Sequence, residues 1–156
     1  MGIPPPGTLM SEHRATVTWV RTSADFTYDS YNRDHVWRVP GGAEIAASSA
    51  PDYRGTAERI DPEQALVAAL SSCHMLTFLA ICARKRITVD SYVDEAIGVM
   101  TKNEKGKLYV SRCTLRPKIT WGGPPPTAEI IADLHHKSHE ECFIANSVLT
   151  EVVVET

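Results

Sequence analysis

Short stretches of alternating apolar and polar residues dominate the first third of the chain. Residues 15–19 alternate as a strand does, and two similar runs, 35–39 and 43–48, flank a Pro-Gly-Gly turn sequence. Residues 22–32 are rich in Ser, Asp and Tyr, which is typical of a loop. The pattern predicts a small antiparallel sheet.

A nearly continuous apolar stretch follows, and its start carries helix-capping signals. Asp61 can cap a helix with Pro62 at the first helical position and Gln64 completing a capping box. Basic residues at 84 and 85 suit the negative end of the helix dipole, so we predict one helix over residues 62–85. Because apolar side chains occupy nearly every face, we expect a central core helix that is covered all round. Its polar centre, residues 71–74, argues against a membrane span.

The second half predicts a hairpin, a helix and a last strand. Residues 87–100 and 108–121 form long strand-like runs joined by a turn sequence, and residues 147–154 are β-branched. Thr127 can cap a helix that extends to about Phe143. This order predicts an α+β fold, with antiparallel sheets around the long helix and the second helix.

Composition limits the class of protein. The 156 residues, 43% of them hydrophobic, suffice for one domain or two intertwined subdomains, and we expect one domain over residues 13–156. We expect residues 1–12 to be a disordered tail; the segment lacks the features of a signal peptide, which favours a cytoplasmic location. A net charge of -3 without a basic stripe excludes nucleic acid as the expected partner. We expect no cofactor.

The four cysteines direct attention to thiol chemistry. None forms a CxxC pair, so neither a zinc ribbon nor a thioredoxin motif is indicated. Cys73 lies 11 residues after Pro62, about 16 Å along the helix, too far for the helix N-terminus to stabilise its thiolate. A cation must then do so, whereas Cys82 and Cys113 are expected to be packing residues. The candidate cations are five arginines in the N-terminal third: Arg21, Arg33, Arg38, Arg54 and Arg59.

Three features together resemble the OsmC/Ohr family of organic hydroperoxide reductases. They are the Pro-Glu-Gln sequence at Glu63, the cysteine ten residues later, and Cys142 within the segment 139–146. The resemblance covers about residues 13–155. It implies Cys73 as the attacking thiolate, Cys142 as the resolving thiol and Glu63 as the carboxylate that orients an arginine. It also implies an organic hydroperoxide substrate and an external thiol or dithiol as reductant.

The resemblance leaves the arginine open between two positions. Arg33-Asp34 resembles the Arg-Asp of the Ohr branch, and we favour Arg33; Arg54 is the alternative, because the OsmC branch carries its arginine closer to the Pro-Glu motif. The chain also has Phe143 after the second cysteine, where Ohr members have Pro, and His74 after the first. These departures indicate a divergent branch.

Helix geometry separates Glu63 from Cys73. On one straight helix they lie about 15 Å apart along the axis and about 80° apart around it, so they do not share a site within one protomer. Unless the helix is displaced near its start, Glu63 serves the site of a partner chain. We therefore predict an intertwined homodimer with composite sites.

Two other functions remain open. His135, His139 and Cys142 recur on one helical face and could bind zinc together with Cys73 or His74. Alternatively, the scaffold could bind a small molecule without turnover. In the peroxidase interpretation, apolar neighbours could form a pocket for the peroxide tail, although most are more simply core residues; they are Leu66, Leu70, Met75 and Phe78.

Overall fold

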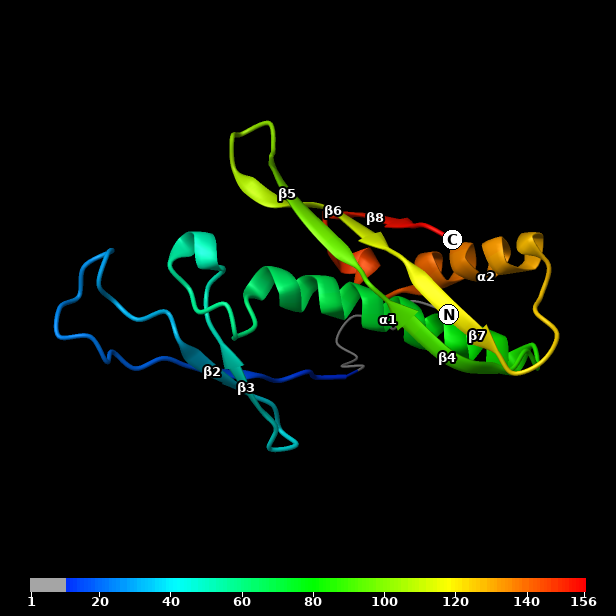
Figure 1. Ribbon diagram of the computed structural model, residues 1–156, viewed down its shortest axis with the longest axis horizontal. Coiled ribbons are helices and arrows are strands. Elements are labelled where there is room, and N and C mark those ends of the chain that lie inside the picture. Colours follow the sequence, from blue (N-terminus) through cyan, green and yellow to red (C-terminus); the bar gives the residue numbers. More distant parts are fainter. Residues whose placement is uncertain (1–10) are drawn as a thin grey trace. The chain divides into compact units, whose positions relative to one another are not determined.

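The computed structural model describes residues 11–156 (Figure 1). The chain divides into two compact units, one ending at Pro62 and the other beginning at Glu63, and each is described by itself. Of the tail expected over residues 1–12, only Ser11 and Glu12 lie within the described residues, and both lie outside any helix or strand. The expected single domain over residues 13–156 stays a prediction.

The first unit contains the predicted antiparallel sheet. Its strands are β1 (Thr16–Thr18), β2 (His35–Arg38) and β3 (Glu44–Ala47), paired in the order β1-β2-β3. The β2–β3 turn closes where Gly42, at a φ of 88°, donates its backbone N–H to the Val39 carbonyl at 2.9 Å. A non-glycine residue adopts this φ only with strain. A short 3-10 helix, η1 (Pro51–Tyr53), follows the sheet.

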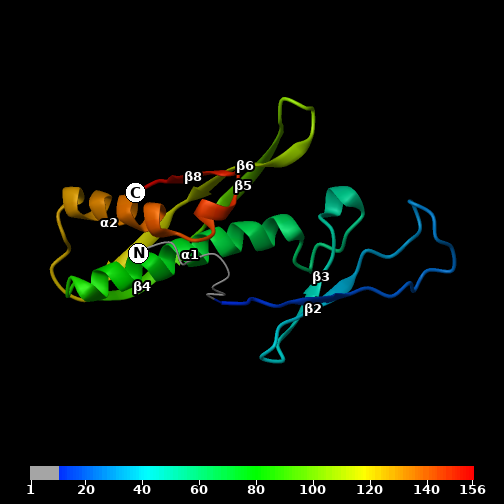
Figure 2. The same cartoon turned by 180° about the vertical axis from the view of Figure 1, so that it is seen from behind.

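The second unit holds both predicted helices. Its elements are α1 (Pro62–Arg84), β4 (Val89–Asp94), β5 (Ile97–Lys102), β6 (Leu108–Leu115), β7 (Pro117–Trp121), α2 (Ala128–Glu141), η2 (Ala145–Ser147) and β8 (Glu151–Val154). The helix ends agree with the predictions to within about two residues. The Thr127 hydroxyl caps α2 by accepting from the backbone N–H of Ile130 at 3.4 Å. Both views show α1 and α2 side by side (Figures 1 and 2).

The two long strands predicted for the hairpin each break in the middle. The inner halves, β5 and β6, form the predicted antiparallel hairpin, whereas the outer halves, β4 and β7, form a separate antiparallel pair. At the break, the backbone N–H of Arg116 donates to the Asp94 carboxylate at 2.6 Å, and Pro117 has no N–H to donate. The ladder hydrogen bonds are therefore interrupted at this position.

The last strand corrects the expectation of wholly antiparallel sheets. Strand β8 pairs with β6 in parallel, with Cys113 opposite Val152 and Leu115 opposite Val154. Parallel neighbours need a long connection, which here includes β7 and α2. The fold class remains α+β, as predicted.

The core of the second unit forms along one stripe of α1. Leu70, His74, Phe78 and Cys82 recur every four residues on this stripe and are buried. Leu70 packs with Cys113 and Leu115 in one cluster, while Phe78 and Cys82 pack with Leu134 of α2 in a second cluster. Strand β6 and helix α2 thus both pack against the buried stripe of α1.

Two expectations for α1 need correction. Only one stripe is buried in the single chain, and Leu76 remains 60% exposed, so α1 is not covered all round. Among residues 11–156, α1 is also the one helix that is long and apolar enough to cross a membrane, so its polar centre does not exclude a span by composition. The Ser71 hydroxyl, however, donates to Asp94 at 2.5 Å, and the His74 ring bonds to α2, as expected of a core helix.

Candidate functional site

The two cysteines singled out by the sequence lie together. Cys73 projects from the middle of α1, Cys142 caps the C-terminus of α2, and both are free thiols joined by a side-chain hydrogen bond. Cys142 is 1% exposed, and its sulfur also accepts from the Ala145 backbone N–H at 3.4 Å. Burial is the main cause that raises the pKa of the Cys142 thiol. The arrangement places a protonated thiol beside the partly exposed Cys73.

The other two cysteines lie in the core clusters. Cys82 packs against Phe78 of α1, and Cys113 packs against Leu70. Burial raises the pKa of the Cys82 thiol. Burial and the nearby Asp94 carboxylate together raise the pKa of the Cys113 thiol to about 11. Neither cysteine is a reactive thiolate at neutral pH, in agreement with the expected packing role.

Arg33 is held in a fixed position within the first unit. Its guanidinium donates to the backbone carbonyls of Tyr28 and Tyr31 and lies over the Tyr31 ring, 3.6 Å from the ring centroid. Among residues 11–156, no carboxylate forms an ion pair with it. Arg33 therefore offers a half-buried positive charge that is oriented but not neutralised.

Arg54, the alternative arginine, is paired with a carboxylate. It follows η1 with a φ of 63° and forms an ion pair with Asp29 at 2.6 Å. The Tyr28 ring lies within 5.1 Å of the Arg33 guanidinium carbon and 5.8 Å of that of Arg54. The geometry within this unit favours Arg33 as the available cation, although the activating role stays a prediction.

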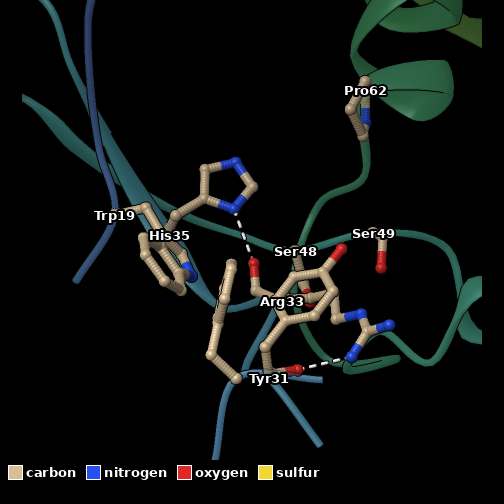
Figure 3. Close-up of a pocket in the computed structure, with 8 residues that line it drawn as sticks. Trp19, Tyr31, Arg33, His35, Ser48, Ser49 and Pro62 are labelled. Carbon is tan, nitrogen blue, oxygen red and sulfur yellow. Dashed lines mark hydrogen bonds between the residues drawn. The ribbon is translucent and has the colours of Figure 1, made fainter. Parts of the chain in front are cut away.

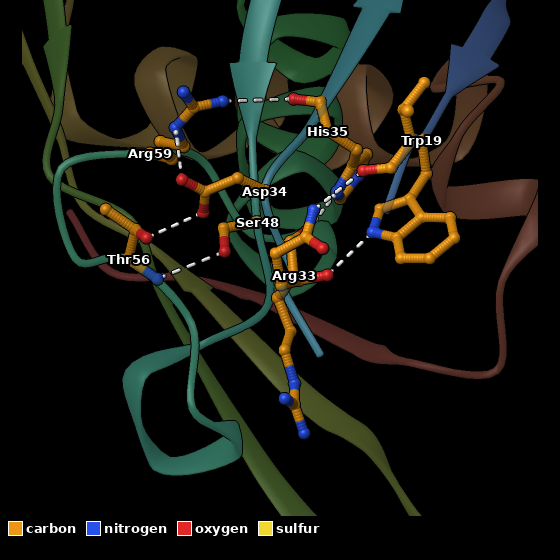
Figure 4. A network of polar contacts seen from close by, with 9 residues as sticks. Trp19, Arg33, Asp34, His35, Ser48, Thr56 and Arg59 are labelled. Carbon is orange, nitrogen blue, oxygen red and sulfur yellow. Dashed lines mark hydrogen bonds and ion pairs between the residues drawn. The ribbon is translucent and has the colours of Figure 1, made fainter. Parts of the chain in front are cut away.

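A polar network holds the residue next to Arg33 (Figure 4). Asp34 accepts a hydrogen bond from the Thr56 hydroxyl at 2.6 Å and forms an ion pair with Arg59 at 3.2 Å. The hydrogen bond from Thr56 is the main cause that lowers the pKa of the Asp34 carboxyl, and the positive charge of Arg59 lowers it further. The Arg33 side chain points away from this network, so Asp34 anchors the start of β2 while Arg33 stays free to face a ligand.

Arg33 also borders a pocket of about 420 Å³ (Figure 3). The rings of Trp19, Phe26 and Tyr31 form an aromatic cluster with centroids 5.6–6.4 Å apart. The pocket is lined by Trp19, Phe26, Tyr31, Arg33, His35, Ser48, Ser49 and Pro62. It therefore combines apolar walls with one cation.

The sequence had suggested other residues for an apolar pocket. Leu70 and Phe78 are fully buried in the core clusters, and Leu66 packs against the cluster of Leu70, so these three are core residues. The aromatic pocket was missed because its rings are spread over loop residues 19–31. No periodic pattern marks such residues.

Glu63 occupies the first turn of α1 and is half-buried. No ion pair joins it to an arginine among residues 11–156. Arg33 belongs to the first unit, whereas Glu63 and Cys73 belong to the second. The pairing of these three side chains is thus a prediction that concerns the assembled protein.

The histidines form a buried pair that the sequence did not predict. His74 and His135 are 1% and 5% exposed, and a hydrogen bond of 3.0 Å joins Nε2 of His74 to Nδ1 of His135. Burial, followed by the charges of His135 and His139, lowers the pKa of His74 to about 4, and burial also lowers the pKa of His135. Both rings are therefore neutral at neutral pH. The one available signal was the placement of His74 and His135 in two apolar-faced helices.

The metal alternative finds no support in this geometry. Within residues 11–156, no three His, Cys, Asp or Glu side chains are arranged to hold a metal ion, the set His135, His139 and Cys142 included. His135 instead forms a hydrogen bond with His74, and the Cys142 thiol forms a hydrogen bond with the Cys73 thiol.

Comparison with known proteins identifies the family of this chain. Residues 55–156 match the OsmC-like protein family, and the chain belongs to it. An OsmC-like protein of unknown function from Vibrio cholerae is 49% identical, with a TM-score of 0.90, over 94% of this chain and 99% of that one. None of the curated proteins matches the sequence.

Two more distant structures share the fold. An organic hydroperoxide resistance protein from Elizabethkingia anophelis, with thiocyanate bound, is 20% identical, with a TM-score of 0.70, over 95% of this chain and 94% of that one. The organic hydroperoxide resistance protein OhrB of Bacillus subtilis is 16% identical, with a TM-score of 0.67, over 94% and 98% of the two chains. The low identities agree with a divergent branch.

Proposed function

We propose that this protein is a thiol-dependent peroxidase that reduces organic hydroperoxides to alcohols. The observation that carries the proposal is the contact between two free thiols, Cys73 and Cys142, on different elements. The hydroperoxide resistance proteins that share the fold support it.

In the first step, the Cys73 thiolate attacks the distal oxygen of the hydroperoxide. The O–O bond breaks, the alkoxide takes a proton and leaves as the alcohol, and Cys73 becomes a sulfenic acid. The Cys142 sulfur then attacks the Cys73 sulfur. Its thiol proton and the sulfenic hydroxyl leave as water, and the resulting disulfide is reduced by an external thiol or dithiol.

Arg33 is the proposed electrostatic partner of this reaction. A guanidinium that no carboxylate of its own unit neutralises can stabilise both the thiolate and the developing alkoxide. The aromatic pocket beside it would take the apolar body of the hydroperoxide. Glu63 would orient the guanidinium by hydrogen bonding.

The complete site would form in an intertwined homodimer. The exposed apolar face of α1, with Leu76, and strand β5, exposed along its length, are surfaces that a partner chain would cover. We further propose a cytoplasmic location, where small thiols are available. Light scattering tests the dimer: a stable, active monomer at micromolar concentration would contradict composite sites.

The chemistry is tested by mass spectrometry after addition of one equivalent of cumene hydroperoxide. We expect the wild-type protein to lose two hydrogens and to yield a peptide pair linked through Cys73 and Cys142. Cys142→Ser should stop at the sulfenic acid, which dimedone traps, and Cys73→Ser should not react. Unchanged thiols in the wild-type protein would instead indicate a binding protein without turnover.

A further inference from the structure

The buried histidine pair lies at the contact between the two helices that carry the thiols. The His74 and His135 rings are nearly parallel, at 8°, with centroids 5.3 Å apart. Phe78, one turn further along α1, also stacks on His135, with ring centroids 4.4 Å apart and an angle of 24° between the rings. His135 of α2 is thus held by two side chains of α1, the hydrogen-bonded His74 ring and the stacked Phe78 ring.

The contacts fix the direction and register of the helices. Cys73 meets Cys142 at the C-terminus of α2, whereas Phe78 packs with His135 and Leu134 nearer to its middle, so the two helices run antiparallel. His135 and Cys142 are seven residues apart, which is about two turns or 10.5 Å on nearly the same face. One register of α2 on α1 therefore satisfies the histidine contact and the thiol contact together.

Another register would break the hydrogen bond that joins the two buried rings, and Nδ1 of His74 already has no partner among the described residues. Sliding α2 by one turn, about 5.4 Å, would separate Nε2 of His74 from Nδ1 of His135 inside a region where both rings are buried. Packing of Leu134 against Phe78 and Cys82 is less specific for one register, because the hydrophobic effect is not directional. The hydrogen bond is directional and specifies one arrangement.

We propose that the His74–His135 pair is a positioning device that sets the register of α2 on α1 and thereby holds Cys142 beside Cys73 for disulfide formation. The inference rests on the proposed roles of the two thiols. His74 and His135 do not touch the reacting sulfur atoms in this role; they act through the helices.

The test measures the disulfide without any peroxide. The dithiol protein is equilibrated with oxidised glutathione, which takes up the two electrons of the new Cys73–Cys142 bond and leaves as two molecules of reduced glutathione. The equilibrium constant reports how well Cys142 is presented to Cys73. His74→Leu should lower this constant by about tenfold, the expected effect of losing one buried hydrogen bond.

Matched variants separate positioning from general destabilisation. His74→Gln keeps a side-chain amide that can bond to His135, and it should recover part of the loss. His136→Leu removes an exposed histidine of the same helix, and its constant should equal that of the wild-type protein. If His74→Leu does not yield folded protein, as judged by circular dichroism, His135→Leu removes the same hydrogen bond and provides the same comparison. An unchanged constant in folded His74→Leu or His135→Leu would overturn the inference.

The experiment also separates this inference from the peroxidase proposal. If glutathione forms the disulfide but cumene hydroperoxide does not, the peroxidase proposal fails while the histidine effect on the constant stands. If both oxidants form it, His74→Leu should leave the rate of sulfenic acid formation unchanged and slow its conversion to the disulfide. Equal slowing of both steps would contradict a positioning role.

Discussion

The guanidinium carbon of Arg33 lies 3.6 Å from the centroid of the Tyr31 ring, and two backbone carbonyls fix its orientation. Arg54, near the same loop, is neutralised by Asp29. The contrast separates two arginines that the sequence left as alternatives. Within this loop, two backbone carbonyls and an aromatic ring orient the Arg33 guanidinium in place of a carboxylate.

Replacing Arg33 by alanine should therefore slow the reaction of Cys73 with cumene hydroperoxide by about 100-fold, the usual loss when one charge-stabilising donor is removed from an active site. Arg33→Lys should recover little, because an ammonium group lacks the planar fork that bonds two carbonyls and stacks on a ring. Stopped-flow kinetics measures the rate. Arg54→Ala is the matched control, and a larger loss in Arg54→Ala than in Arg33→Ala would reverse the assignment.

Acid should destabilise the fold through His74. Because the pKa of His74 is about 4 in the folded chain and near 6.5 in an unfolded chain, the unfolded state binds more protons between these values. The free energy of unfolding should fall by up to about 3 kcal/mol as pH decreases from 6.5 to 4, with the neighbouring His135, His139 and Asp94 modifying the curve. Urea unfolding at several pH values measures this fall. His74→Phe should flatten the profile, and an equally steep fall in that variant would assign it to other groups.

Strand β5 packs closely against α1 at Gly98. A methyl group added there would lie 2.5 Å from Cγ2 of Val67, so the Val67 side chain or one of the two elements would have to shift. Gly98→Ala should destabilise the protein by about 1–3 kcal/mol in urea unfolding, the usual cost of overpacking. Adding Val67→Ala should recover part of this loss. Gly123→Ala, at a position with no atom within 4 Å of the added methyl, should change stability by less than about 0.5 kcal/mol.

The sequence was most informative where structure depends on near neighbours. The proline at residue 62 and the cap at Thr127 act within one turn, and the helix starts follow from them. The breaks in the long strands were not visible, because Asp94 and Arg116 meet only after the chain has folded back on itself. Local pattern contains no information about such a bond.

The candidate site shows the same division. The family resemblance singled out Cys73 and Cys142, and the structure brings their thiols into contact, whereas their catalytic roles stay a prediction. The pairing of His74 with His135 joins residues 61 positions apart, and the choice between Arg33 and Arg54 depends on where Asp29 lies in a loop. Both features require the three-dimensional arrangement.

Burial of Cys82 and Cys113 has a consequence for oxidative damage. Thiols that stay protonated in a closed core react slowly with oxidants, so these two cysteines are protected from conversion to sulfinic and sulfonic acids. In the proposed cycle, oxidation is confined to Cys73 and Cys142, whose product is a reducible disulfide. The fold would thus let the protein meet oxidants repeatedly while only its repairable sulfur atoms change.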